Sequence, residues 1–323
     1  MARLSADERQ IKSMFAYKRP RGSATEAAFI ERFLTPLGFM KDTYGNLHLT
    51  VGDPAPPVLF SSHSDTVHRS EGLQDLDYRG GILRLTRQAR LTSNCLGADD
   101  TAGVWLMTEM VKAGVRGHYI IHYGEESGCL GSSDLANNHE DFLRQFKIAV
   151  AFDRAGKADV ITYQMGVRCA SEDFAKALAA SLGEGYAPCS WGAYTDTNEY
   201  TRLISECTNI SVGYQHQHSP KETQDVPFLI SLRDKLLSVD WEALPTVREP
   251  GSFEWPDDDL DSSFGGRDWR GRWRQQDRMI DLCKEYPEVV ADILEQHGVD
   301  IKSVRDAVAF YYGENTDEGG RAA

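Results

Sequence analysis

Short apolar runs alternate with helical segments through most of the first 240 residues. The run 58–62 is apolar, follows two prolines and has the length of a strand that is buried on both faces of a parallel sheet. Similar runs at 119–123, 148–152 and 209–213 predict three more strands. This alternation predicts an α/β fold, a three-layer sandwich around a mostly parallel central sheet.

Helix signals lie between these runs. Ser23 and Glu26 form a capping-box pattern before the apolar residues of a helix that Gly38 ends. Glycines also follow two of the other predicted helices, as C-terminal capping requires. Those other helices are 5–18, 100–113, 172–182 and 226–237.

Two pairs of shorter strands complete the prediction. Residues 39–43 and 46–51 have strand composition and are joined at Tyr44–Gly45. Gly80–Gly81 precedes the run 82–86, which we expect to form a hairpin with 90–92.

The composition changes at about residue 243. Prolines, an acidic run at 257–259 and a glycine pair predict a linker over 244–274. Helical periodicity then predicts a small helical extension with a disordered tail over 275–323. The main domain is therefore expected to span 1–243.

Charge and composition exclude several classes of protein. Aspartate and glutamate number 49 against 35 lysines and arginines, a net charge of −14, which argues against general nucleic-acid binding. No apolar run has the length of a membrane span, and the first residues lack a secretory segment. The six cysteines show no CxxC spacing, so we expect neither a disulfide framework nor a structural zinc site, and a cytoplasmic location.

Residue types that bind metals follow the predicted strands. The carboxyl ends of parallel strands form the ligand site of an open α/β sheet. Candidate ligands directly after, or a few residues past, four of the strands are His63, the Glu125–Glu126 pair, Asp153 and His218. A further candidate, Asp99, lies in the turn before the helix 100–113. Imidazole and carboxylate without thiolate suit zinc or a harder divalent ion.

Five ligands exceed the needs of one tetrahedral zinc and suit two ions that share a carboxylate, for which we choose Asp99. Two ions about 3.5–4 Å apart can share a water, lower its pKa and polarise a substrate carbonyl. A further carboxylate must then take the proton, and Glu125 and Glu126 supply one ligand and one base. Asp65, two residues past His63, can accept a hydrogen bond from that imidazole and fix its tautomer.

Each residue also has a structural explanation when it is considered alone. Asp99 and Asp153 could cap helices, His63 could be a core histidine, and the glutamate pair could belong to a solvated loop. Their occurrence together, in this order and at strand ends, favours the metal site.

As an ordered set over roughly residues 24–240, these segments resemble the co-catalytic zinc exopeptidases, the superfamily of peptidase T, carboxypeptidase G and the bacterial leucyl aminopeptidases. The matching segments are SHSDTV (62–67), LGADDTAG (96–103), GEESGCLGS (124–132), Asp153, the Thr195–Asp196 pair and HSPKE (218–222). The resemblance implies the zinc exopeptidase fold, also called phosphorylase/hydrolase-like, and two bound zinc ions.

The resemblance also assigns roles. His63, Asp99 and Asp153 would hold one zinc, and Asp99, Glu126 and His218 the other. Glu125 would be the general base. A non-proline cis peptide would join Asp99 to Asp100.

One departure from the superfamily concerns its lid. Peptidase T and carboxypeptidase G relatives carry a lid or dimerisation domain between the counterparts of Asp153 and Thr195. Only 41 residues separate these two here, enough for a hairpin, a helix and a loop. We therefore do not expect a lid-mediated dimer, and the oligomeric state stays open.

The sequence predicts a metal-dependent hydrolase of amide bonds, an aminopeptidase that acts on short peptides. One alternative is a carboxypeptidase or N-acyl-amino-acid deacylase that binds a substrate carboxylate through Arg168 or Arg202. An alternative from another class is a non-catalytic metal-binding module whose extension recruits a partner. Side-chain preference and native metal stay open.

Overall fold

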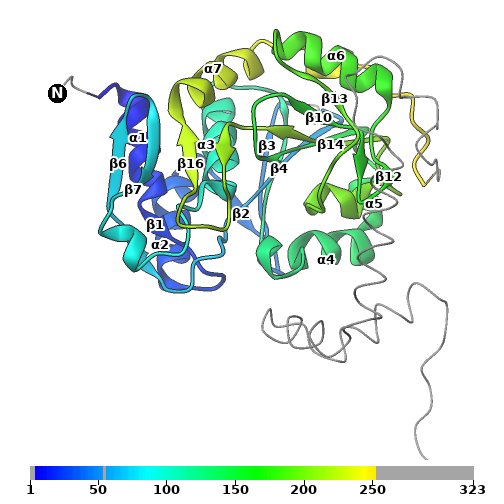
Figure 1. Cartoon of the computed structure of the whole chain (residues 1–323). Helices are drawn as coiled ribbons and strands as arrows, with labels where there is room; N and C mark the ends of the chain where they lie inside the picture. Colours follow the sequence, from blue (N-terminus) through cyan, green and yellow to red (C-terminus); the bar gives the residue numbers. More distant parts are fainter. Residues whose placement is uncertain (1–3, 54–55, 252–323) are drawn as a thin grey trace, which may run out of the picture. The chain divides into compact units, whose positions relative to one another are not determined.

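The computed structural model describes residues 4–53 and 56–251 (Figure 1). They belong to the first of two compact units, Met1–Asp257. Most of the predicted linker and the whole helical extension lie outside the described residues.

An eight-stranded mixed sheet forms the centre of this unit, in the order β13-β10-β14-β9-β4-β8-β3-β2. Its four middle strands run parallel to one another, and three of them are buried along their whole length. Near-continuous apolar sequence suits burial on both faces, but the strand 206–211 buries Glu206, Thr208 and Asn209 and begins three residues before the predicted run 209–213. The four are β14 (Glu206–Ser211), β9 (Ile148–Arg154), β4 (Val58–His63) and β8 (Gly117–His122).

The outer strands of this sheet add antiparallel pairs. On one side β3 pairs with β8 and β2 pairs with β3; on the other, β10 is antiparallel to β14 and parallel to β13. The strands are β2 (Met40–Lys41), β3 (Leu47–Val51), β10 (Asp159–Ile161) and β13 (Ala187–Cys189). The prediction of an α/β sandwich with a parallel centre is confirmed.

Helices cover both faces of the sheet (Figure 1). α3 packs on β4 and β9 and contacts α1 and α7, whereas α4 lies on the other side of the sheet in Figure 1. The helices are α1 (Ala6–Phe15), α2 (Ala24–Phe33), α3 (Ala98–Lys112), α4 (Leu130–Asn138), α5 (Glu140–Leu143), α6 (Glu172–Leu182) and α7 (Val226–Leu236). No described helix combines the length and the apolar character that a membrane span requires.

A separate four-stranded sheet corrects one prediction. Strand β7 (Ile82–Leu85) pairs with β6 (Leu76–Arg79), which precedes the glycine pair, and not with residues 90–92. Gly80 and Gly81 have φ of 62° and 83°, so they form the hairpin turn itself. β16 (Thr223–Asp225) and β15 (Tyr214–Gln215) complete this sheet, and residues 89–91 form a 3₁₀ helix.

The capping box predicted at the start of α2 is only half formed. Ser23 Oγ accepts the Glu26 N–H, but the carboxylate of Glu26 accepts hydrogen bonds from Gly22 N–H and Ser64 Oγ. Glu26 is buried, so its side chain joins helix α2 to the chain that follows β4. The full reciprocal capping box occurs instead at Ser5 in α1.

Between Asp153 and Thr195 the chain forms β10, a two-stranded hairpin, α6 and β13. The hairpin strands are β11 (Tyr163–Gln164) and β12 (Val167–Arg168). The predicted hairpin and helix are therefore present in this segment.

The described chain beyond residue 243 packs on the domain, with Leu244 buried in the core and Arg248 making the most hydrogen bonds. The buried guanidinium of Arg248 donates hydrogen bonds to the carbonyls of Thr201, Ile204 and Ser205, and Glu206 Oε1 accepts the Arg248 N–H. The boundary at 243 stays a prediction, and a truncation that keeps these contacts would fall after Gly251.

Candidate metal centre

The fold brings the five predicted ligands together, although they are up to 155 residues apart in sequence. In each of three groups, three possible ligand atoms lie within 4.8 Å of one another. The first two groups consist of predicted ligands alone and share Asp99: His63, Asp99 and Asp153, and Asp99, Glu126 and His218. The third group contains His63 with both glutamates, Glu125 and Glu126.

The first group is deeply placed. His63 is the last residue of β4, and its Nε2 lies 3.1 Å from Asp99 Oδ1 and 3.8 Å from Asp153 Oδ1. Asp153 lies near the end of the neighbouring strand β9. Parallel pairing of β4 and β9 places these two side chains at the same edge of the sheet.

The second group is formed by two loops and the same aspartate. His218 lies between β15 and β16, and its Nε2 is 3.2 Å from Asp99 Oδ2 and 3.2 Å from Glu126 Oε1. Half of the His218 side chain is exposed, so this side of the centre is open to solvent. The two oxygens of Asp99 thus face two different histidines.

Glu125 lies beside these groups in a 3₁₀ turn that directly follows β8. Its Oε2 is 3.9 Å from His63 Nε2, and its Oε1 accepts a weak contact from the thiol of Cys129 at 3.7 Å. Its amide N–H donates to Asp65 Oδ1 at 3.1 Å. Both glutamates of the pair therefore reach the centre.

Asp65 makes a different contact to His63 from the one expected. His63 Nδ1 lies 3.0 Å from the backbone carbonyl of Asp65 and 3.5 Å from its carboxylate. The carbonyl is the closer acceptor, and the carboxylate is engaged by Glu125. An N–H on Nδ1 leaves the Nε2 lone pair directed at the centre.

Asp100 connects α3 to the end of β4. Its carboxylate accepts hydrogen bonds from the Ser62 hydroxyl, from His63 N–H and from Gly103 N–H. The Asp99–Asp100 peptide is cis, as the resemblance implied.

Glu222 is a positioning residue that the sequence did not single out. Its buried carboxylate accepts four backbone N–H groups at 2.7–3.2 Å, those of residues 96, 97, 98 and 99. These four hydrogen bonds hold the backbone of the turn that carries Asp99. Glu222 stands in the HSPKE segment, but no local pattern indicated that it reaches a turn 123 residues earlier.

Asp153 is held by two side chains that come from distant loops. Thr195 Oγ1 donates to its Oδ2 at 2.9 Å, and the hydroxyl of Tyr214 donates to its Oδ1 at 3.1 Å. The neighbouring Asp196 accepts a hydrogen bond from Ser132. Thr195 therefore orients Asp153 by a hydrogen bond, and Asp196 anchors the same segment to α4 through Ser132.

Arg168 and Arg202, the two candidates for binding a substrate carboxylate, make different contacts. Arg202 contacts Glu140, Asn137 and the carbonyl of Ala136 at the end of α4. The guanidinium of Arg168 stacks on the ring of Tyr163 in the β11–β12 hairpin. Arg202 is thus engaged with α4 and α5, and Arg168 with the ring of Tyr163.

The site fits divalent cations. Burial, reinforced by the charge of Asp153, raises the pKa of Glu125 to about 10, and burial also raises the pKa values of Asp153 and Glu126. Glu126 Oε1 is buried and makes no hydrogen bond of good geometry, although it lies 3.2 Å from His218 Nε2. Cations between such groups would favour the ionised carboxylates and supply the missing partner.

Comparison with known proteins agrees with this geometry. The model of "Peptidase family M28" matches residues 46–201, which include four of the five candidate ligands and Glu125. No curated protein sequence matches the chain.

Solved structures share the fold. The aminopeptidase PepT from Bacillus cereus has a TM-score of 0.58 at 15% identity and covers 71% of this chain and 95% of its own. A tripeptidase from Staphylococcus aureus has a TM-score of 0.58 at 14% identity, with the same coverage. An aminopeptidase from the archaeon Desulfurococcus kamchatkensis has a TM-score of 0.57 at 13% identity, covering 73% of this chain and 95% of its own.

The fold and the family match place the chain in the superfamily of co-catalytic zinc peptidases. It is a metallopeptidase-type hydrolase.

Proposed function

We propose that the chain is a cytoplasmic di-zinc aminopeptidase that removes residues from short peptides. The observation that carries this proposal is the shared position of Asp99, whose Oδ1 lies 3.1 Å from His63 and whose Oδ2 lies 3.2 Å from His218. A carboxylate whose two oxygens each face a histidine can bridge two metal ions, with one histidine bound to each ion. Asp153 and Glu126 would complete one site each.

Two divalent ions bound there would acidify a water and polarise a substrate carbonyl. The protein's own part in the reaction is proton transfer. Glu125 would accept the water's proton on its carboxylate and pass it to the departing amine, since its Oε2 lies 3.9 Å from His63 Nε2, beside both groups. Asp65 would hold Glu125 in place through the backbone N–H.

A pair of matched variants tests these roles. Glu125→Gln keeps the shape of the side chain and removes the proton acceptor, so kcat should fall by roughly 10²–10⁴-fold with metal content retained. Glu126→Gln should instead lower the metal content. Metal analysis and steady-state kinetics on both proteins decide the assignment, and a metal-depleted Glu125→Gln beside a metal-replete, inactive Glu126→Gln would reverse it.

Substrate class needs a second experiment. Dipeptides with a blocked C-terminus and dipeptides with a blocked N-terminus would be offered in competition. An aminopeptidase hydrolyses the former, whereas the carboxypeptidase or deacylase alternative requires the free carboxylate and should depend on Arg168 or Arg202. Absence of hydrolysis of either set by a protein with two bound ions would favour the non-catalytic binding module.

A further inference from the structure

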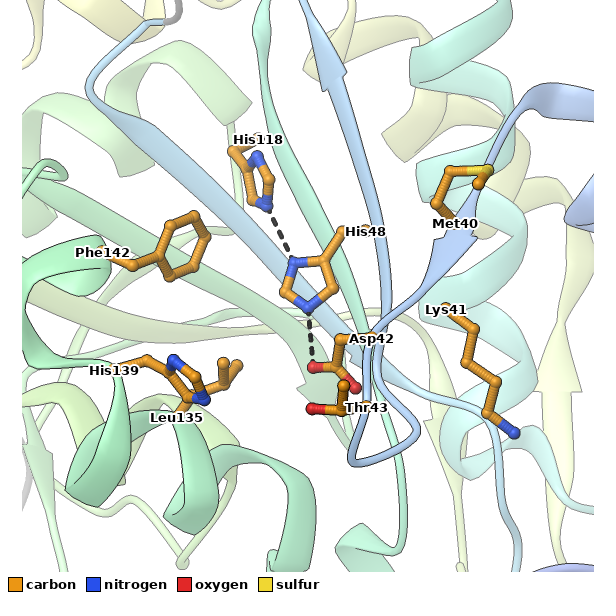
Figure 2. Close-up of a pocket in the computed structure, with 9 residues that line it drawn as sticks. All are labelled: Met40, Lys41, Asp42, Thr43, His48, His118, Leu135, His139 and Phe142. Atoms are coloured by element: carbon orange, nitrogen blue, oxygen red, sulfur yellow. Dashed lines mark hydrogen bonds and ion pairs between the residues drawn. The ribbon is translucent and has the colours of Figure 1, made fainter.

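A cavity of about 490 Å³ lies beside strands β3 and β8, and the residues that line it are labelled in Figure 2. It is lined by the turn between β2 and β3 and by α4 and α5. The lining includes three histidines, His48, His118 and His139, together with Asp42 and Phe142. His118 precedes His122, at the centre's end of β8, by four residues, which is about 13 Å of strand.

Strand pairing brings two of these histidines into contact. Thr50 of β3 is the direct partner of His118 of β8, and His48 lies two residues before Thr50 on the same face. His48 Nδ1 and His118 Nε2 are 3.1 Å apart, as the dashed line in Figure 2 marks. Both rings project into the cavity.

The tautomer of His48 is fixed by Asp42. Burial works against ionisation of Asp42, but hydrogen bonds from Asn46 and Gly45 outweigh it and lower the pKa of its carboxyl group. An ionised carboxylate only accepts, so His48 Nε2, at 3.1 Å from Asp42 Oδ2, must carry the proton. In the neutral ring, Nδ1 then presents its lone pair to His118.

The second ring nitrogen of His118, Nδ1, also has a possible hydrogen-bond acceptor. This nitrogen lies 2.8 Å from the hydroxyl of Thr50, which can accept an N–H and so leave the lone pair on Nε2. Burial, and then the nearby His48, lowers the pKa of His118 to about 3, so this ring is neutral at pH 7. A neutral imidazole whose other nitrogen is hydrogen-bonded is the form that binds metals.

We propose that His48 Nδ1 and His118 Nε2 form a second metal site, separate from the co-catalytic centre, for a divalent transition ion that prefers imidazole, such as Zn²⁺. Two nitrogens bonded to one ion at about 2.0–2.1 Å are about 2.8–3.0 Å apart in octahedral geometry and about 3.3–3.4 Å apart in tetrahedral geometry, and the observed 3.1 Å lies between these values.

Water completes the coordination, and His139 lies on the opposite rim of the cavity (Figure 2). The His139 side chain is half exposed, and its closest acidic neighbour, Asp134, is 3.7 Å away. The site would link the adjacent strands β3 and β8.

Metal counting on the whole protein tests the proposal. Wild type, His48→Phe and His118→Phe are each equilibrated with Zn²⁺, dialysed and analysed for ions per chain, and Co²⁺ titrations are followed by absorption. Wild type should hold one ion more than either variant, while peptide hydrolysis is unchanged. Met40→Leu, which lines the same cavity without a nitrogen donor, is the matched control and should match wild type.

A second measurement does not depend on the variants folding. Nitrogen NMR of the wild-type imidazoles should show Zn²⁺ shifting His48 Nδ1 and His118 Nε2 and leaving His48 Nε2 protonated. His139→Ala, which removes an imidazole from the opposite rim and leaves the His48–His118 pair intact, should leave the Zn²⁺ affinity unchanged. Equal ion counts in all proteins and unshifted His48 and His118 resonances would mean that the pair is only hydrogen-bonded, and would overturn the proposal.

Discussion

The amide N–H of Glu125 donates a hydrogen bond of 3.1 Å to Oδ1 of Asp65. Asp65 lies two residues past the end of β4 and Glu125 three residues past the end of the adjacent β8. One buried carboxylate therefore links the ends of two neighbouring parallel strands, next to the candidate metal centre.

This relationship predicts a selective effect of Asp65. Asp65→Ala removes the acceptor for Glu125, while His63 keeps its closer partner, the backbone carbonyl of residue 65 at 3.0 Å. We expect kcat to fall by roughly 10–100-fold with metal affinity affected less. Asp65→Asn retains an acceptor oxygen and should recover part of the activity. Metal loss as complete as that of an Asp99 variant would contradict this division.

A second prediction concerns Asp99 and the number of ions. Because both of its oxygens face histidines of separate groups, Asp99→Ala should weaken both metal sites at the centre. Isothermal titration with Zn²⁺ and metal analysis measure the change. Asp77→Ala, on the separate sheet and paired with Arg79 and Arg84, is the control and should leave the ion count alone. An Asp99→Ala protein that keeps one tight ion at the centre would count against the shared ligand.

A third prediction concerns Glu222. Glu222→Gln puts an amide NH₂ where a carboxylate oxygen now accepts two backbone N–H groups, so two buried donors of the Asp99 turn lose their acceptor. Each such loss costs about 1–3 kcal/mol, and the melting temperature and the Zn²⁺ affinity should both fall. Lys221→Gln changes the exposed neighbour and serves as the control. A Glu222→Gln protein that melts like wild type would disprove the role.

A fourth prediction concerns acid stability and His68. Burial, and then the positive charge of Arg19, lowers the pKa of His68 from 6.5 to about 4. Below pH 6.5 the unfolded chain therefore binds a proton that the folded chain refuses, and stability falls as the pH drops towards 4. The loss is roughly 3 kcal/mol at most.

The measurement is urea unfolding between pH 7 and 4 with a chelator present, so that metal release does not contribute. His68→Asn should show a flatter dependence of the unfolding free energy on pH than wild type. His139→Asn, which replaces a half-exposed histidine, is the matched control. Parallel pH profiles for wild type and His68→Asn would contradict the prediction.

The pattern of apolar runs predicted the sheet well where burial is complete. β4, β8 and β9 have apolar sequence because both faces of the sheet are covered there. An apolar run in the sequence was therefore enough to predict each of these strands. The hairpin at Gly80–Gly81 was predicted wrongly because the glycines were read as preceding a strand, whereas their positive φ makes them the turn between β6 and β7.

By itself the sequence determined which residue types stand at the strand ends, and therefore that His63, Asp99, Glu126, Asp153 and His218 could converge. Only the tertiary structure decided how they are supported. The carboxylate of Glu222, the Tyr214 hydroxyl on Asp153 and the His48–His118 contact all join segments at least 61 residues apart. Hydrogen bonds of this kind depend on the packing of distant elements, and no local periodicity records them.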